Sequence, residues 1–137
     1  MIIEINKFNY EEYKCLLLSY INRKSNSKFD TIFLLENKDL VLQPDLERIK
    51  EDDYFYFLVI GKNGVEGGAE VFMENSILYL EYLNSFKRGI GKKLIKYLQS
   101  NFKHIKVTIK DRNLYGYYRK YGFRKVRGIN EMFWKKI

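Results

Sequence analysis

Three short strand-like segments in the middle of the chain set the strongest limit on its fold. Residues 54–60, 68–73 and 77–83 are rich in aromatic and β-branched side chains. A Gly-Lys-Asn-Gly turn at 61–64 and a second turn at 75–76 separate them. Segments of this length with such short connections predict an antiparallel meander of three strands. The remaining residues must therefore fold around a sheet.

Helical patterns and further strands lie on both sides of the meander. Apolar residues in 9–23 recur with helical spacing, and Asn9 is the expected N-cap. Residues 25–30 suit a loop, 31–37 a short helix, and 44–50 a further helix that opens with its proline. We also expect a strand over 2–6, a helix over 89–101, a strand over 105–109, a helix from 112 or 113 to 121, and strands over 124–126 and 132–135. This order predicts an α+β fold with a mixed central β-sheet flanked by helices.

Composition limits the classes of protein that remain. The 137 residues are enough for one domain, which we expect to span 1–137, and 46% hydrophobic residues can form its core. Cys15 and His104 are the single cysteine and histidine, so we expect no disulfide framework and no metal centre. No apolar run approaches the roughly 20 residues that span a bilayer, and charges come too early for a signal peptide. We expect a cytoplasmic protein without membrane contact.

Charge divides the sequence into two unlike parts. Residues 1–85 contain 9 Lys and Arg against 15 Asp and Glu, whereas residues 86–137 contain 16 against 2. A basic segment favours a polyphosphate ligand or nucleic acid, and an acidic segment favours a cation. Any single lysine is more simply explained as part of a solvated surface. For the C-terminal segment as a whole we expect an anionic partner.

The junction between the third meander strand and the next helix carries the clearest chemical signal. Gly89 and Gly91 stand where the strand ends and the helix begins. Glycines there let backbone N–H groups face outward, and a helix N-terminus attracts phosphate. The cations around this point are Lys87, Arg88, Lys92 and Lys93. The segment predicts a diphosphate cradle, although a plain strand-to-helix turn that needs glycine for tightness explains it equally well by itself.

A second segment favours the cradle. Residues 107–123 run from a strand through a polar junction into a helix that ends Tyr-Arg-Lys-Tyr-Gly-Phe, where Gly122 is a natural helix stop. The two segments in this order resemble the GNAT (Gcn5-related) N-acetyltransferase superfamily. The order of strands and helices agrees over the whole chain, and the part that bears the motifs is residues 77–127. The resemblance implies a sheet that is splayed between its fourth and fifth strands.

The resemblance also implies an acetyl-CoA site. The coenzyme A diphosphate would lie on the loop and helix start formed by Phe86, Lys87, Arg88, Gly89, Ile90, Gly91 and Lys92. The pantetheine arm would hydrogen-bond, like an added strand, to the exposed backbone of Glu81, Tyr82 and Leu83. Asp111 or Asn113 would also hold this arm. The sequence departs from the family pattern at Phe86, where Arg or Gln is usual, and at Asp111, where Asn is usual.

Acetyl transfer to an amine needs a proton donor and a neutral amine. The resemblance assigns the donor to Tyr118, whose phenol can protonate the departing thiolate. A lysine-like amine is almost fully protonated at pH 7, so a general base matters for such acceptors. Glu81 is our first candidate for this base, Glu70 and Glu74 are further ones, and water can relay the proton instead.

Two functions therefore stay open. The first is an acetyl-CoA-dependent N-acetyltransferase that acts on a primary amine. Because the N-terminal half is acidic, we expect a cationic acceptor, such as a polyamine, a basic peptide or an aminoglycoside. The second is a non-catalytic module of the same fold that binds acyl-CoA or nucleic acid. Nucleic acid is possible but not favoured, and the sequence does not indicate an oligomeric state.

Overall fold

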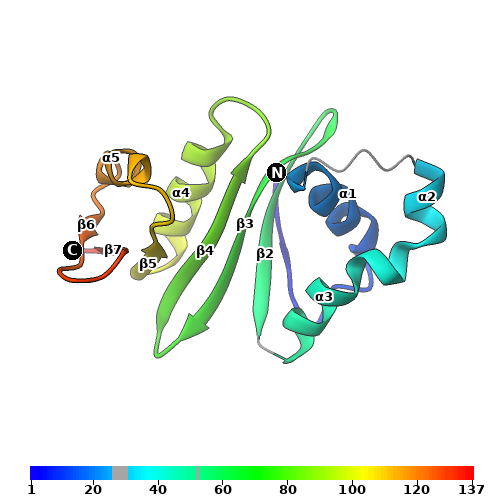
Figure 1. The fold of residues 1–137 in the computed structure, drawn as a ribbon, viewed down its shortest axis with the longest axis horizontal. Helices are drawn as coiled ribbons and strands as arrows, with labels where there is room; N and C mark the ends of the chain where they lie inside the picture. The colour runs from blue at the N-terminus through cyan, green and yellow to red at the C-terminus, as the bar shows by residue number, and fades with distance from the viewer. Residues whose placement is uncertain (26–30, 52) are drawn as a thin grey trace.

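The chain folds around one seven-stranded sheet with the order β1-β2-β3-β4-β5-β7-β6 (Figure 1). The computed structural model describes residues 1–25, 31–51 and 53–137, so the loop predicted over 25–30 lies largely outside the described residues. The strands are β1 (Ile2–Ile5), β2 (Tyr54–Gly61), β3 (Gly64–Glu74), β4 (Ile77–Ser85), β5 (His104–Thr108), β6 (Arg124–Lys125) and β7 (Glu131–Lys135). The helices are α1 (Lys14–Lys24), α2 (Thr31–Glu36), α3 (Lys38–Glu51), α4 (Ile90–Asn101) and α5 (Asn113–Arg119).

The predicted meander is present, and it fills the first half of the sheet. Strands β1 to β4 pair antiparallel with their neighbours, whereas β4 and β5 pair parallel. A parallel pair needs a crossover connection, and α4 supplies it. Strands β5, β7 and β6 complete the sheet by antiparallel pairing. The mixed sheet and its flanking helices confirm the fold class that the sequence predicts.

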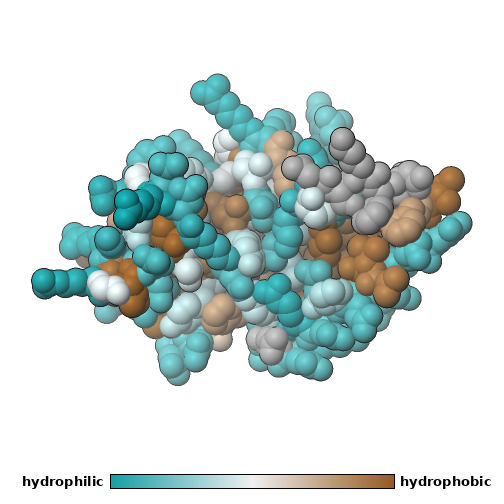
Figure 2. All heavy atoms as spheres, viewed as in Figure 1, coloured by the Kyte–Doolittle hydropathy of each residue, from teal (hydrophilic) through white to brown (hydrophobic). Residues whose placement is uncertain are grey.

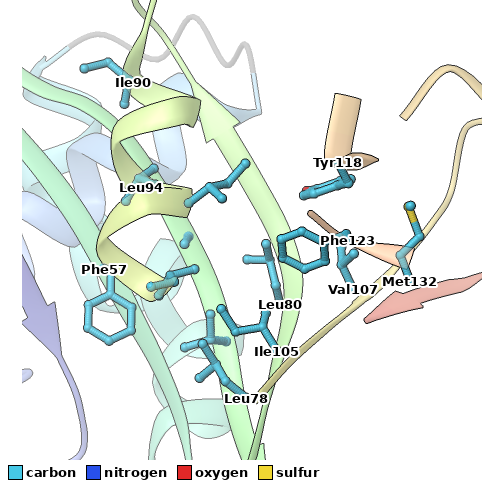
Figure 3. Packing of buried hydrophobic residues seen from close by; sticks show 14 of the residues in the cluster. Phe57, Leu78, Leu80, Ile90, Leu94, Ile105, Val107, Tyr118, Phe123 and Met132 are labelled. Carbon is cyan, nitrogen blue, oxygen red and sulfur yellow. The ribbon is translucent and has the colours of Figure 1, made fainter. Parts of the chain in front are cut away.

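Two apolar clusters hold the helices to opposite faces of the sheet. On one face, the apolar stripe of α4, including Ile90 and Leu94, packs against sheet residues such as Leu78 and Leu80 (Figure 3). Tyr118 of α5 joins the same cluster. On the other face, α1 and α3 cover the side of the sheet that contains β1 and β2. Figure 1 shows α1, α2 and α3 together on one side of the molecule and α4 beyond β4.

Strand β4 contains a bulge that ends its pairing with β5. Glu70 of β3 lies opposite Tyr82, and Val71 lies opposite Leu80, so Glu81 is an extra residue in β4. A bulge of this kind increases the local twist and bends the strand. The parallel pairing with β5 stops at Leu80, opposite Val107. Beyond this point, no described strand pairs with that edge of β4, which confirms the predicted splay.

A buried carboxylate fastens α1 to the strands beside the bulge. Glu70 is fully buried, and its carboxylate accepts hydrogen bonds from the Tyr20 hydroxyl at 2.7 Å and from Lys24 at 2.9 and 3.1 Å. The Asn84 amide of β4 donates to the same Tyr20 hydroxyl at 2.9 Å. A buried charge is tolerated when it is paired and hydrogen-bonded, as here. Removing one partner would therefore cost stability.

The structure corrects two helix starts. The first helix begins at Lys14 rather than near residue 9, because Asn9 belongs to the turn after β1: its side-chain oxygen accepts from the Asn6 N–H, and its amide donates to the Glu4 carbonyl. Pro44 lies inside α3 rather than at its start. The helix continues through the proline, and buried residues on both sides of it, including Leu42, hold it to the sheet.

The exposed surface is largely hydrophilic in the view of Figure 2, with apolar surface at the end where α2 lies. Exposed apolar side chains on α2 and at the start of α3 are Ile32, Phe33, Leu35 and Leu40. None of the described helices is both long enough and apolar enough to cross a membrane.

Buried tyrosines predict an alkaline loss of stability. Burial, reinforced by the Glu70 charge, raises the pKa of Tyr20 above its usual value near 10, and burial beside Asp45 does the same for Tyr56. Above about pH 10 the unfolded chain releases these protons while the folded chain keeps them, so the free energy of unfolding falls by up to about 1.4 kcal/mol per pH unit for each tyrosine. Urea denaturation at several pH values between about 10 and 11 measures how steeply the free energy of unfolding falls with pH. This fall should be less steep for the Tyr20→Phe variant than for the wild type. An equally steep fall in both proteins would contradict the raised pKa of Tyr20.

Candidate functional site

The loop between β4 and α4 presents backbone N–H groups at the start of the helix. Gly89, the N-cap, has φ of +88°, a left-handed conformation that glycine adopts without strain. The N–H groups of Ile90 and Lys93 donate to carbonyls of this loop. The N–H groups of Gly91 and Lys92 have no acceptor among the described residues, as expected in the first turn of a helix. These groups are available to an anionic ligand.

A basic pocket of about 880 Å³ opens beside this helix start. We call it the basic pocket; it is lined by Ser85, Arg88, Gly89, Gly91, Lys92, Lys96, Tyr117, Lys120 and Tyr121. Four of these residues are cations and none is a carboxylate. A concave site with this charge and unpaired N–H groups suits a polyphosphate. The predicted diphosphate residues Arg88, Gly89, Gly91 and Lys92 all lie here.

The absence of a side chain at Gly91 leaves room for the close approach of Tyr117. A Cβ atom at Gly91 would collide with the Tyr117 hydroxyl, and it would lie 3.9 Å from a methyl group of Leu83. Burial, followed by the influence of the neighbouring Tyr121, raises the pKa of Tyr117 to about 12. By sequence alone, Tyr117 is one of several tyrosines close to Tyr118 and is not singled out from them. Tyr121 follows Tyr117 by four residues, in the turn after α5, and the two rings lie 5.5 Å apart.

Tyr118 lies on another side of α5, in the core. It is 4% exposed, and its ring contacts those of Tyr117 and Phe123 at centroid distances of 5.2 and 5.4 Å (Figure 3). No described residue hydrogen-bonds its hydroxyl, yet this oxygen is not among the fully enclosed unpartnered atoms, so it keeps contact with solvent. Burial, and then the charge of Tyr117, raises the pKa of Tyr118. The phenol therefore holds its proton at neutral pH.

Past Leu80, the edge of β4 that faces β5 carries the residues predicted to hold pantetheine. Glu81 accepts a hydrogen bond from Arg48 of α3 at 3.1 Å. Tyr82 is 38% exposed, and the Lys110 ammonium lies 3.4 Å from its ring centroid. Leu83 instead packs against the α4 cluster. After the bulge, Glu81, Tyr82 and Leu83 thus contact α3, Lys110 and the α4 cluster in turn. The backbone edge of β4 that faces β5 stays unpaired among the described residues.

An aromatic cleft of about 400 Å³ adjoins the splay on the face of the sheet that carries α3. We call it the aromatic cleft; it is lined by Tyr54, Phe72, Tyr79, Leu80, Glu81, Thr108 and Lys110. Leu80 is the last residue of β4 that pairs with β5, and Glu81 is the bulge residue. The basic pocket lies beside α4 and α5, so the splay separates two sites of different chemistry. A ligand in the basic pocket and a second ligand in the aromatic cleft can therefore meet at the open edge of β4.

Other predicted residues lie outside these two sites. The Phe86 N–H donates to the Glu66 carbonyl at 2.9 Å, and the Phe86 ring lies under Arg23. Lys87 pairs with the Glu66 carboxylate at 3.0 Å. The Asp111 carboxylate accepts from the Asn113 N–H at 3.0 Å, so both residues form the turn before α5.

The three candidate carboxylates differ widely in their surroundings. Glu81 lines the aromatic cleft. Glu70 is enclosed and already bound to Tyr20 and Lys24. Glu74 is exposed and pairs with Ile77 at the opposite end of β4 from the splay. Of the three, Glu81 is therefore the carboxylate placed to meet a ligand in the cleft.

A metal centre finds no support in the described ranges. No cluster of three or more His, Cys, Asp or Glu residues within them could hold a metal ion. Cys15 is exposed on α1. Burial, followed by the charges of Lys106 and Lys135, lowers the pKa of His104, which lies on β5 outside both sites.

Solved structures provide the comparison, since no family model and no curated protein matches the sequence. A GNAT-family acetyltransferase from Staphylococcus aureus Mu50 is 22% identical with a TM-score of 0.60, and the match covers 98% of each chain. Aminoglycoside 6′-acetyltransferase type Ii is 15% identical with a TM-score of 0.66, over 100% of this chain and 97% of that one. The PaiA N-acetyltransferase of Thermoplasma acidophilum, solved with coenzyme A, is 12% identical with a TM-score of 0.54, over 98% and 99%. The splayed sheet, the order of its strands and these similarities show that the chain has the GNAT acetyltransferase fold.

Proposed function

We propose that the protein is an N-acetyltransferase of the GNAT superfamily that transfers an acetyl group from acetyl-CoA to a primary amine. The observation that carries the proposal is the basic pocket, which meets the helix N-terminus beside the open edge of β4. A solved neighbour of the same fold is bound to coenzyme A. Because acetyl-CoA joins a polyphosphate to an amide-containing arm, it matches both features.

The residues that would hold acetyl-CoA are in two groups. The free N–H groups of Gly91 and Lys92, with the cations of the basic pocket, would bind the phosphates. The backbone of residues 81–83 would hydrogen-bond the pantetheine amides as an added strand. The bound cosubstrate supplies an acetyl thioester. Asp111 and Asn113 remain candidates to contact the arm from the start of α5.

Two side chains are proposed to move protons. A C–N bond forms between amine and acetyl carbon, the C–S bond breaks, and the amine proton must leave while the sulfur gains one. Tyr118 would give its phenolic proton to the sulfur, and its raised pKa keeps that proton available at neutral pH. Glu81, directly or through water, would accept the proton of the amine. Arg48 engages one oxygen of Glu81 and leaves the other for this task.

Acetyl-CoA binding tests the cradle first. Acetyl-CoA should raise the thermal midpoint of the wild-type protein, because a ligand at about 100 times its Kd adds about 2.7 kcal/mol to the folded state. The Gly91→Glu variant should lose this shift, since the new side chain displaces Tyr117 and carries negative charge toward the phosphates.

A matched control separates the cradle from general charge effects. Gly116→Glu makes the same change on α5, where an added Cβ meets no atom within 4 Å, and it should retain the shift. A wild-type protein without a shift at millimolar acetyl-CoA contradicts the cosubstrate. Normal binding by a folded Gly91→Glu variant would place the phosphate site elsewhere.

Turnover tests the proton donor. Tyr118→Phe keeps the ring contacts with Phe123, so acetyl-CoA affinity should change little while release of free CoA slows by about 10²–10⁴-fold. Tyr115→Phe, on the same helix with its hydroxyl near Asn130, should keep the wild-type kcat. A large loss in Tyr117→Phe with none in Tyr118→Phe would transfer the role to Tyr117. Binding of acetyl-CoA without turnover of any amine would favour the non-catalytic alternative.

A further inference from the structure

The aromatic cleft has an apolar wall made by three strands. Tyr54, Phe72 and Tyr79 are directly opposite one another on β2, β3 and β4. The rings of Phe72 and Tyr79 stack in parallel at 4.9 Å, and those of Tyr54 and Phe72 lie 5.3 Å apart with a tilt of 38°. Rings stacked in this way turn their faces toward each other, and the Arg48 guanidinium lies 4.1 Å from the centroid of the Tyr54 ring. The wall is therefore apolar without offering an open row of ring faces, and it favours a ligand with an apolar body.

The charged groups around this wall are unequally paired. Glu81, the one carboxylate in the lining, is neutralised by Arg48 at 3.1 Å. Lys110, the lining cation, forms no ion pair with any described residue and instead lies 3.4 Å from the Tyr82 ring centroid. Lys106, the neighbour of Tyr79 on β5, likewise contacts a ring rather than a carboxylate. Glu131 on β7 lies opposite Thr108, a residue of the lining.

This local charge differs from the charge of the N-terminal half as a whole. The expectation of a cationic acceptor was based on the sum over residues 1–85. Most of those carboxylates lie elsewhere: Asp39 and Glu47 line a surface hollow between α1 and α3, and Glu70 is enclosed by its partners. A ligand in the aromatic cleft meets one neutralised carboxylate and cations without acidic partners. Electrostatic complementarity there favours an anionic group.

We infer that the acceptor is a primary amine that carries an anionic group, such as a carboxylate, on an apolar body. This inference rests on the proposed acetyltransferase function and defines its acceptor class. The body covers the ring wall, the anionic group faces Lys110, and the amine lies toward Glu81 at the splay. The carboxylate of Glu81 then accepts from the amine, and Arg48 holds that carboxylate in place.

Three amines of one shape test the inference. Benzylamine, para-aminomethylbenzoate and para-xylylenediamine share the reacting aminomethyl group and the ring, and they carry no charge, a negative charge or a positive charge at the far end. We expect the benzoate to have the highest kcat/KM, up to about fivefold above benzylamine, because one exposed ion pair changes affinity by up to about fivefold. The diamine, counted per amine, should lie below benzylamine.

Reversing the charge of Lys110 tests whether the preference among the three amines arises in the aromatic cleft. Lys110→Glu should reverse the preference, so that the diamine exceeds the benzoate. Lys62→Glu makes the same change in net charge at an exposed position in the turn between β2 and β3, and it should keep the wild-type order.

The outcomes separate the inference from the function on which it rests. A wild-type protein that shows no thermal shift with millimolar acetyl-CoA would remove the proposed function itself. If acetyl-CoA binds but the diamine equals or exceeds the benzoate, or none of the three amines is acetylated, the acceptor class is wrong. An unchanged order in Lys110→Glu would also overturn the inference.

Discussion

Strand β4 gains one residue relative to β3 at Glu81, and the geometry of the whole site follows from this bulge. Up to Leu80 the strand pairs with neighbours on both edges, and beyond it only the β3 side is paired within the described chain. An open edge in the middle of a sheet leaves backbone N–H and C=O groups without hydrogen-bond partners, so a ligand can pair with them. Because α4 begins at the end of the same strand, this edge leads directly to the N–H groups of a helix start. Both features that suit acetyl-CoA therefore have one structural origin.

Buried polar contacts hold this geometry in place. Glu70 lies directly opposite Tyr82, and the Tyr20 hydroxyl links its carboxylate to Asn84 near the end of β4. The hydrogen bonds thus fix α1 to the strands on both sides of the bulge. On the opposite face, Leu83 packs against the apolar cluster that contains Ile90 and Leu94 of α4. The hydrogen bonds on one face and the packing of Leu83 on the other hold the end of β4 in place. They therefore oppose a movement that would pair its open edge with β5.

Local patterns in the sequence predict most of the elements, because strand alternation, glycine turns and helical spacing act over few residues. The α4 start at Gly89 follows from such signals, whereas the neighbouring position of β4 and β5 follows from the family resemblance. The helix start at Lys14 was missed because Asn9 satisfies the backbone of the preceding strand end rather than a helix. Pro44 was misplaced because helix α3 already begins at Lys38, with Leu42 buried before the proline.

The site was predicted less completely, since its details depend on contacts between distant segments. The bulge depends on the register between β3 and β4, which no local pattern specifies. The pairing of Arg48 with Glu81 joins residues 33 positions apart, and the approach of Tyr117 to Gly91 joins two helices. Net charge summed over half the chain also hides where the charges lie. The cleft with Lys110 became visible as a distinct electrostatic environment only after the strands were placed.

Amide hydrogen exchange with and without saturating acetyl-CoA tests the central claim most directly, because it reports which backbone N–H groups the ligand covers. The account predicts slower exchange in residues 81–83 and in residues 88–92, with no change in β1 on the far edge of the sheet. Protection confined to other segments, with acetyl-CoA bound, would contradict the account.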